Sequence, residues 1–217
     1  MARLKVAVLI SGRGSNLQAL IDACADPNFP AEIRLVISNE PGAQGLARAG
    51  RAGIPTRIIP HKQFPDRPTF DAAVERALEE ADTALVCLAG FMRIFSDGFV
   101  ERWRDRMINI HPSLLPAFKG LKVHERVIAA GVRFTGCTVH YVRPAMDEGP
   151  VIVQAVVAVL PGDDAARLAE RVLAEEHKIY PLALRLIAEG RVHISGERAE
   201  IDGAAAPTPT ALVNPPD

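Results

Sequence analysis

The first half of the chain alternates between apolar runs and segments with helical spacing. Strands are predicted over 5–10, 33–37, 56–59 and 84–89, and the runs at 5–10 and 84–89 are apolar almost throughout, as in a strand that is buried on both faces. Apolar residues recur at helical spacing in a segment that begins near Ser15 and in two others, 43–52 and 70–78. This alternation predicts an α/β fold with a doubly wound, mostly parallel, Rossmann-like sheet, which binds ligands at the carboxyl ends of its strands.

The second half has a different pattern. A short strand begins at Met107, and a helix over 123–130 is predicted to end at Gly131. Two further strands, 134–142 and 151–160, are joined by a short proline-bracketed connection, which is typical of an antiparallel extension of the sheet. The remaining predicted elements are a loop over 60–68, a long helix from 163 to about 189, a hairpin over 191–201 and a disordered tail over 203–217.

Composition narrows the class of protein. The chain has 217 residues, 48% of them hydrophobic, which suits one well-packed domain, predicted over 1–202. A net charge of −1 argues against a nucleic-acid-binding protein, and no segment approaches the ~20 apolar residues of a membrane span. Cys24, Cys87 and Cys137 stand far apart in apolar settings. We therefore expect a cytoplasmic protein with reduced thiols.

The segment MINIHPSLLPAFKG, residues 107–120, holds the first candidate chemistry. Asn109 and His111 are two residues apart on a strand, so their side chains point the same way. Pro112 prevents the strand from continuing in the sheet. An amide and a protonated imidazole are suited to stabilise an oxyanion. Ser113 lacks the glycine-flanked turn of a catalytic serine. The alternative interpretation is an ordinary strand end.

A glycine-containing loop, SGRGSN, follows the first strand. The amides of Gly14, Ser15 and Asn16 are predicted to lie at a helix N-terminus, where they favour an anion. Ser15 stands where a dinucleotide fingerprint requires its third glycine. Glu40, after the next strand, could serve as the ribose-binding acid of that fingerprint, but the remaining GxG is weak evidence for a nicotinamide cofactor. A phosphate monoester suits the loop better, and a plain glycine turn is the alternative.

Two other segments have both a structural and a functional interpretation. The loop GFMRIF, residues 90–95, is apolar, which suits either packing into the core or the wall of a site for a flat ligand. Asp147 is either a turn residue or the carboxylate partner of His111. His111, His124 and His140 match no zinc signature, so we predict no metal site.

Four motifs in order make the chain resemble the phosphoribosylglycinamide formyltransferase family, from about residue 5 to about 190. They are SGRGSNL (11–17), LAGFMRI (88–94), NIHPSLLP (109–116) and MDEGPVI (146–152). Segments like NIHPSLLP occur throughout the formyltransferase superfamily, including methionyl-tRNA formyltransferase and formyltetrahydrofolate hydrolase. The SGRGSNL loop is what points to the ribonucleotide branch.

The resemblance implies transfer of a formyl group from 10-formyltetrahydrofolate to the amino group of N1-(5-phospho-D-ribosyl)glycinamide, in de novo purine (IMP) biosynthesis. It implies a phosphate-binding half, 1–105, a catalytic and folate half, 106–202, and a monomer or homodimer without metal. The implied catalytic residues are Asn109, His111 and Asp147. Gly14, Ser15, Asn16 and Glu176 would bind the ribonucleotide, with Gly14 to Asn16 at its phosphate and Glu176 at its ribose. Arg67, Met92, Arg93, Ile94, Phe95 and Asn109 would line the folate pocket, on which the 143–147 loop closes.

The resemblance is poorest at 117–122, where Lys119 and Lys122 replace a proline and a histidine of the family pattern. Two rival functions remain at this point. One is hydrolysis of the same formyl donor, with water as the acceptor. The other is a non-catalytic module that senses a phosphorylated metabolite through the Gly14 loop.

Overall fold

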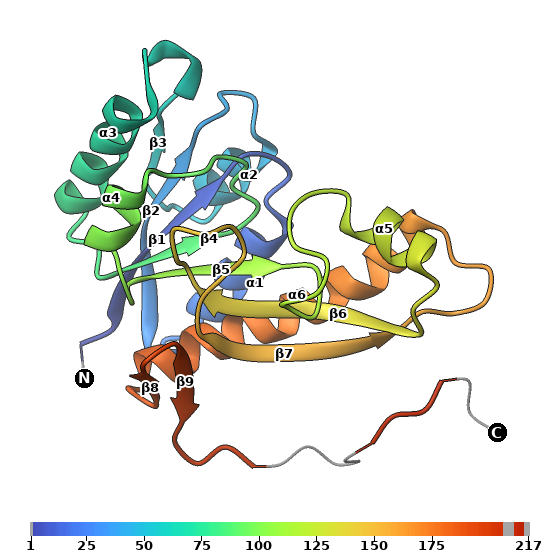
Figure 1. Cartoon of the computed structure of the whole chain (residues 1–217). Helices are drawn as coiled ribbons and strands as arrows, with labels where there is room; N and C mark the ends of the chain where they lie inside the picture. The colour runs from blue at the N-terminus through green and yellow to red at the C-terminus, as the bar shows by residue number, and fades with distance from the viewer. Residues whose placement is uncertain (1, 206–210, 215–217) are drawn as a thin grey trace.

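The computed structural model describes residues 2–205 and 211–214. Its main feature is a seven-stranded sheet with the strand order β3-β2-β1-β4-β5-β6-β7 (Figure 1). The strands are β1 (Leu4–Ile10), β2 (Ala31–Ser38), β3 (Thr56–Ile58), β4 (Leu85–Leu88), β5 (Met107–His111), β6 (Phe134–Tyr141) and β7 (Val151–Ala158). The pairs from β3 to β5 are parallel, whereas β6 and β7 are antiparallel. The predicted fold class, including the antiparallel extension, is confirmed.

Helices cover both faces of the sheet (Figure 1). They are α1 (Ser15–Cys24), α2 (Gln44–Arg51), α3 (Arg67–Glu80), α4 (Asp97–Arg102), α5 (Val123–Ala130) and α6 (Ala165–Ala188). The buried side chains form two clusters, one between the sheet and α1, α5 and α6, and one between the sheet and α3 and α4. Apolar strands covered on both faces explain the continuous hydrophobic runs in the sequence.

The predicted C-terminal boundary of the 60–68 loop is wrong. A 3-10 turn, η1, occupies His61–Gln63, and α3 already begins at Arg67. Asp66 caps α3, because its carboxylate accepts a hydrogen bond of 2.9 Å from the Thr69 amide. Pro68 fits in the first turn, where its missing N–H has no helical partner in any case.

The long helix α6 is fixed to the strands beneath it by Tyr180. This side chain is fully buried, and its hydroxyl donates a hydrogen bond of 2.9 Å to the carbonyl oxygen of Leu88, the last residue of β4. Glu176 lies one turn earlier on α6 and therefore on the same face of the helix. Tyr180 thus places Glu176 near the carboxyl ends of the strands.

The predicted terminal hairpin is confirmed as β8 (Val192–Ser195) and β9 (Arg198–Ile201). The disordered tail predicted over 203–217 falls partly on 206–210 and 215–217, which lie outside the described residues. The Asn214 amide donates hydrogen bonds to the carbonyl oxygens of Arg133 and Val159.

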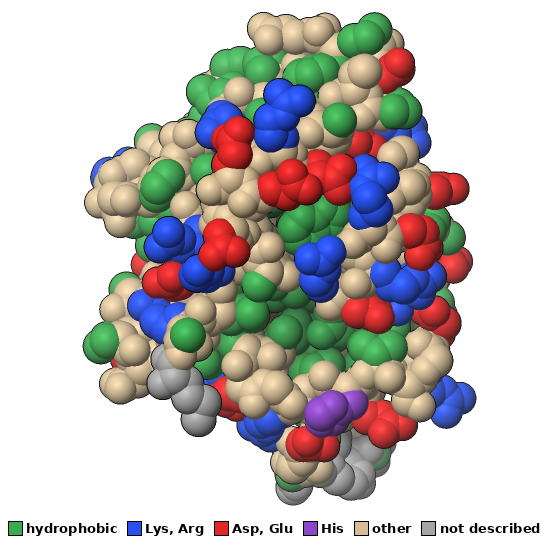
Figure 2. Space-filling model, turned by 90° about the vertical axis from the view of Figure 1, so that its left-hand side faces the viewer, with side chains coloured by type: hydrophobic (Ala, Val, Ile, Leu, Met, Phe, Trp, Pro, Cys, Tyr) green, Lys and Arg blue, Asp and Glu red, His purple; other side chains and the backbone are tan. Residues whose placement is uncertain are grey.

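The three cysteines are free, as predicted. None of the helices in the described part of the chain combines the length and the apolarity needed to cross a bilayer. On the face shown in Figure 2, basic and acidic side chains alternate around a hydrophobic patch, without a large area of one sign.

Candidate active site

Three loops meet where β1, β4 and β5 end side by side in the sheet. The Ser11 amide donates a hydrogen bond of 3.1 Å to the Gly90 carbonyl oxygen, which joins the loop after β1 to the loop after β4. The Ser11 hydroxyl oxygen accepts a hydrogen bond of 2.7 Å from the Met92 amide. Adjacent parallel strands bring these segments together at the carboxyl edge of the sheet, where the sequence analysis expected a ligand to bind.

The first of these loops is shaped by Gly14, which precedes α1 in the left-handed conformation with φ +71°. A Cβ at this position would lie 2.6 Å from the Gly45 Cα. Glycine is therefore required both by the positive φ and by the lack of space for a side chain. The first turn of α1 has no side-chain cap. The amides of Ser15 and Asn16 therefore lie at an uncapped helix N-terminus, as predicted for an anion site.

The ribonucleotide candidates on α1 and α6 are in contact. Nδ2 of Asn16 donates a hydrogen bond of 2.7 Å to Oε2 of Glu176, although the two residues are 160 positions apart. Burial raises the pKa of Glu176, and the hydrogen bond from Asn16 partly opposes that shift. Oδ1 of Asn16 is buried and has no partner among the described residues. A polar ligand is suited to supply the missing donor.

The folate candidates on the loop after β4 divide into two groups. Met92 and Ile94 are exposed by 67% and 56%, although they are large and apolar. Phe95 is buried and stacks on Phe99, with ring centroids 4.2 Å apart, so only its main chain can face a ligand. Nε of Arg93 is buried and without a partner in the described structure. The loop thus offers apolar surface and one unpaired donor.

Arg67, the remaining folate candidate, is exposed in the first turn of α3. The Phe70 ring on the same helix lies 6.5 Å from the Phe91 ring and 6.4 Å from the Phe95 ring, measured between centroids. The start of α3 therefore packs next to the 90–95 loop.

His111 lies at the end of β5 with only 5% of its surface exposed. Its Nε2 is 3.0 Å from the Phe118 carbonyl oxygen, and its Nδ1 is 3.4 Å from Oδ1 of Asp147. A carbonyl oxygen can only accept, so Nε2 carries a proton. The contact between His111 and Asp147 that the sequence analysis expected is therefore present.

Asp147 is held by a hydrogen bond from the 117–122 loop. Its Oδ2 accepts a hydrogen bond of 2.6 Å from the Gly120 amide, and its backbone is in the left-handed region with φ +52°. Nζ of Lys119 lies 2.6 Å from Oε1 of Glu148, so the 117–122 loop makes a second contact with the same connection. Phe118 and Lys122 also have positive φ. Such strain gathers at functional sites because surrounding contacts must maintain it.

Asn109 has a partner that the sequence did not reveal in this role. Nδ2 of Asn109 lies 3.4 Å from Nε2 of His140. Nδ1 of His140 is 2.9 Å from the Tyr141 carbonyl oxygen and must donate to it, so Nε2 keeps its lone pair for the Asn109 amide. Burial lowers the pKa of His140, which favours this neutral form. The signal was the register of β5 and β6, which pairs Asn109 with His140.

Ser113 and His124, two further polar residues of this region, differ in their contacts. The buried Ser113 hydroxyl donates a hydrogen bond of 2.5 Å to the Ala117 carbonyl oxygen, so it shapes the turn. Burial lowers the pKa of His124, whose Nδ1 is buried without a partner within the described chain. No group of three or more His, Cys, Asp or Glu residues in the described ranges is arranged to hold a metal ion.

Comparison with known proteins gives one family. The model of the formyl transferase family matches residues 4–184. The phosphoribosylglycinamide formyltransferase of Escherichia coli (strain K12) is 42% identical over 204 residues, which are 94% of this chain and 96% of that protein. The trifunctional purine biosynthetic protein adenosine-3 of Homo sapiens is 54% identical over 92% of this chain, which spans 20% of the length of that protein.

Solved structures agree with these relatives. The crystal structure of glycinamide ribonucleotide transformylase 1 from Symbiobacterium toebii has a TM-score of 0.89 and 47% identity, and the match covers 92% of this chain and 94% of that one. The family match, the full-length relative and the shared fold agree with the four motifs of the sequence. The chain therefore belongs to the formyl transferase family and, within it, to the phosphoribosylglycinamide formyltransferases.

Proposed function

We propose that this protein transfers the formyl group of 10-formyltetrahydrofolate to the amino group of N1-(5-phospho-D-ribosyl)glycinamide, in de novo purine (IMP) biosynthesis. The observation that carries the proposal is the cluster of Asn109, His111 and Asp147 at the carboxyl edge of the sheet. This cluster supplies hydrogen-bond donors and a carboxylate but uses no serine or cysteine nucleophile. It suits a reaction in which the substrate brings its own nucleophile, the amine.

The ribonucleotide binds through the loop after β1. Its phosphate accepts hydrogen bonds from the amides of Gly14, Ser15 and Asn16, and the helix dipole of α1 favours its negative charge. Glu176 accepts hydrogen bonds from the ribose hydroxyls. The contact between Asn16 and Glu176 supports this arrangement, because it places the two parts of the ribonucleotide site side by side.

The folate lies along the loop after β4. Met92 and Ile94 provide apolar surface for its ring system, and Phe95 and Asn109 contribute to the walls of the pocket. Arg93 and Arg67 provide positive charge for its carboxylates, and the 143–147 connection closes on the pterin. The exposed apolar side chains and the unpaired Nε of Arg93 support this part of the proposal.

The amine attacks the formyl carbon, and the carbonyl oxygen becomes an oxyanion. Asn109 donates one N–H to it, and His111 donates from Nδ1. That edge of the ring is available because its contact with Asp147 is not a hydrogen bond, whereas Nε2 is held by the Phe118 carbonyl oxygen at 3.0 Å. The bond from the formyl carbon to N10 then breaks, and the proton lost by the amine is passed to N10.

Asp147 lies beside His111 and stabilises positive charge on the imidazole while the oxyanion forms. A single preorganised donor of this type is worth roughly 2.7–4 kcal/mol of barrier. Holding both substrates in register supplies a further part of the acceleration. The mechanism needs no metal ion, because these side chains meet the developing charge.

The proposal includes a cytoplasmic protein, active as a monomer or homodimer, with residues 1–202 as one domain. Its phosphate-binding half is 1–105, and its catalytic and folate half is 106–202. The assembly state is tested by light scattering and by measuring kcat over a wide range of protein concentrations.

The function is tested by mixing the purified protein with a 10-formylfolate analogue whose deformylation changes its absorbance, with and without the ribonucleotide. A signal that requires the ribonucleotide is the expected result. A signal without it indicates hydrolysis of the donor, and no signal despite binding of both compounds indicates a sensor. Either of these outcomes contradicts the proposed transfer.

A further inference from the structure

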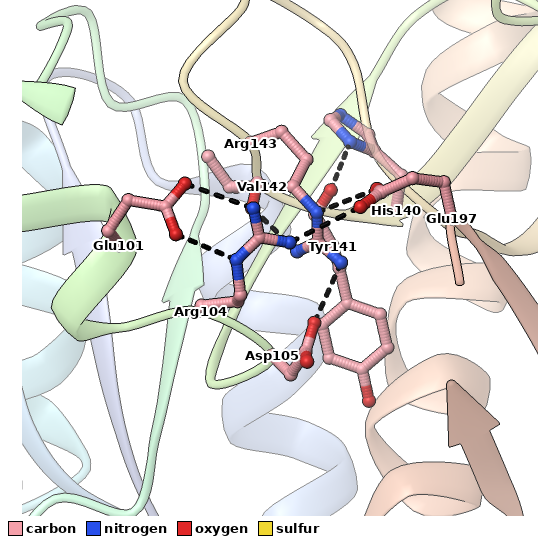
Figure 3. A network of polar contacts seen from close by, with 8 residues as sticks. All are labelled: Glu101, Arg104, Asp105, His140, Tyr141, Val142, Arg143 and Glu197. Atoms are coloured by element: carbon pink, nitrogen blue, oxygen red, sulfur yellow. Dashed lines mark hydrogen bonds and ion pairs between the residues drawn. The ribbon is translucent and has the colours of Figure 1, made fainter. Parts of the chain in front are cut away.

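Arg143 is a buried arginine at the base of the connection that carries Asp147. Each of its three guanidinium nitrogens donates one hydrogen bond, in the network that Figure 3 shows. Nε donates a hydrogen bond of 2.8 Å to Oε2 of Glu197, and Nη2 donates one of 2.8 Å to Oδ1 of Asp105. Nη1 donates a third, of 3.2 Å, to the Val142 carbonyl oxygen. Only 7% of the side chain is exposed. A buried charge with three partners is an ordered contact and differs from a typical surface ion pair.

The partners of Arg143 come from two other parts of the fold. Asp105 lies in the turn that leads into β5, and Val142 donates a backbone hydrogen bond of 2.9 Å to Met107, the first residue of that strand. Glu197 lies in the turn between β8 and β9. The base of the connection is therefore fixed both to the strand of Asn109 and His111 and to the terminal hairpin.

The aliphatic part of the Arg143 side chain also packs against Gly149, near the other end of the connection. A Cβ on Gly149 would lie 3.0 Å from the Arg143 Cγ and 2.0 Å from the Tyr141 carbonyl oxygen, so the far end of the connection packs directly against its beginning. The Tyr141 amide donates a hydrogen bond of 2.9 Å to the Pro150 carbonyl oxygen. Both ends of the segment 142–150 are thus held at one place.

From that place the chain has a short path to His111. The base lies level with Met107, and His111 is four residues further along β5, roughly 13 Å at the rise of an extended strand. Asp147 is four residues from Arg143, a reach of at most about 14 Å. The segment is short, and Asp147 is in a strained conformation with positive φ. A displaced base therefore displaces the carboxylate.

We infer that Arg143 is a positioning residue: with Asp105 and Glu197 it fixes the base of the 142–150 connection, and so the separation of Asp147 from His111 and Gly120. The terminal hairpin thereby contributes to the active site without touching a substrate. The catalytic consequence rests on the proposed function, whereas the positional one concerns the ligand-free protein.

The test compares Arg143→Ala and Glu197→Ala with Glu101→Ala. Glu101 is the matched control, because Arg104 binds both it and Glu197, but only Glu197 reaches Arg143 (Figure 3). Two quantities are measured in each variant. They are the kinetic constants for formyl transfer and the hydrogen exchange of the Gly120 amide, which donates its hydrogen bond to Asp147. Glu197 is exposed, so its variant folds even where Arg143→Ala does not.

Arg143→Ala is expected to lower kcat roughly 100-fold, the effect of misplacing a catalytic group by about 1 Å, with little change in KM for the ribonucleotide. The Gly120 amide should exchange at least 10-fold faster, while amides in the centre of β5 keep their protection. Glu197→Ala should change both quantities in the same direction by a smaller factor, and Glu101→Ala should change neither.

Unchanged Gly120 exchange in Arg143→Ala and Glu197→Ala overturns the inference, whatever happens to kcat. So does an equal loss of protection throughout β5, because that indicates general destabilisation. If the unaltered protein transfers no formyl group, the proposed function fails, but the exchange series still decides whether Arg143 fixes Asp147.

Discussion

Nδ2 of Asn109 lies 3.4 Å from Nε2 of His140, its direct neighbour across β5 and β6. The ring donates through Nδ1 to the Tyr141 carbonyl oxygen, so its other nitrogen is an acceptor. One N–H of the Asn109 amide is thereby directed to His140, which leaves the other for the proposed oxyanion. A neutral histidine thus sets the orientation of the amide that we propose to be catalytic.

His140→Ala should lower kcat by about 10-fold, because the Asn109 amide is free to rotate away from the oxyanion. The KM for the ribonucleotide should change little, since His140 lies away from the Gly14 loop. Steady-state kinetics with both substrates varied checks this. His124→Ala is the control, and an equal loss of kcat there would indicate that the effect is not specific to Asn109.

Replacing Asp147 by asparagine should reduce kcat by roughly 100- to 1000-fold while the protein stays folded. Asparagine keeps the size of the side chain but removes the negative charge that lies next to His111. His111→Asn should have a similar effect, and the double variant should be little worse than either alone, because the two residues act as a unit. Additive losses in the double variant would contradict the pairing.

Gly14→Ala should destabilise the protein by about 1–2 kcal/mol or more, since alanine is strained at a positive φ and its Cβ meets the Gly45 backbone. Binding of the ribonucleotide should also weaken, because the loop changes shape. Gly12→Ala is the matched control in the same loop, where a Cβ would meet no atom within 4 Å. Urea denaturation and isothermal titration measure the two effects, and similar losses in both variants would refute the assignment.

The stability of the protein should fall in mild acid. Burial lowers the pKa of His124, His140 and His177 below 6.5, so these groups stay neutral in the folded protein while the unfolded chain takes up protons. Their contribution is complete above pH 6.5 and is lost as the pH falls through 6.5 towards the lower folded values. The pKa of Glu176 is raised, and its contribution has the opposite sign, present at low pH and lost as the pH rises.

Urea denaturation at pH 8 and pH 6 measures this dependence. The free energy of unfolding should be smaller at pH 6, and His140→Gln should reduce the difference because glutamine does not titrate. A free energy that is equal at both pH values in the unaltered protein would show that the folded and unfolded chains bind the same number of protons between these pH values, which contradicts the lowered pKa values of these histidines.

The sequence by itself determined the elements and the chemistry at the ends of the strands. Apolar runs of β-branched residues and helical spacing are local properties, so the order of strands and helices followed directly from them. Glycine at position 14 and proline at position 112 act on their own backbone, and the loop and turn they predict are present. The start of α3 was missed because Asp66 as a cap competes with Pro68 as a loop signal.

Only the tertiary structure decided which distant residues meet. The contact of Asn16 with Glu176, the pairing of Asn109 with His140 and the network of Arg143 join positions 160, 31, 38 and 54 residues apart. Such contacts depend on strand register and on the packing of helices across the sheet, which no local pattern encodes. The sequence therefore named the candidate catalytic groups, and the fold decided which residues lie next to them.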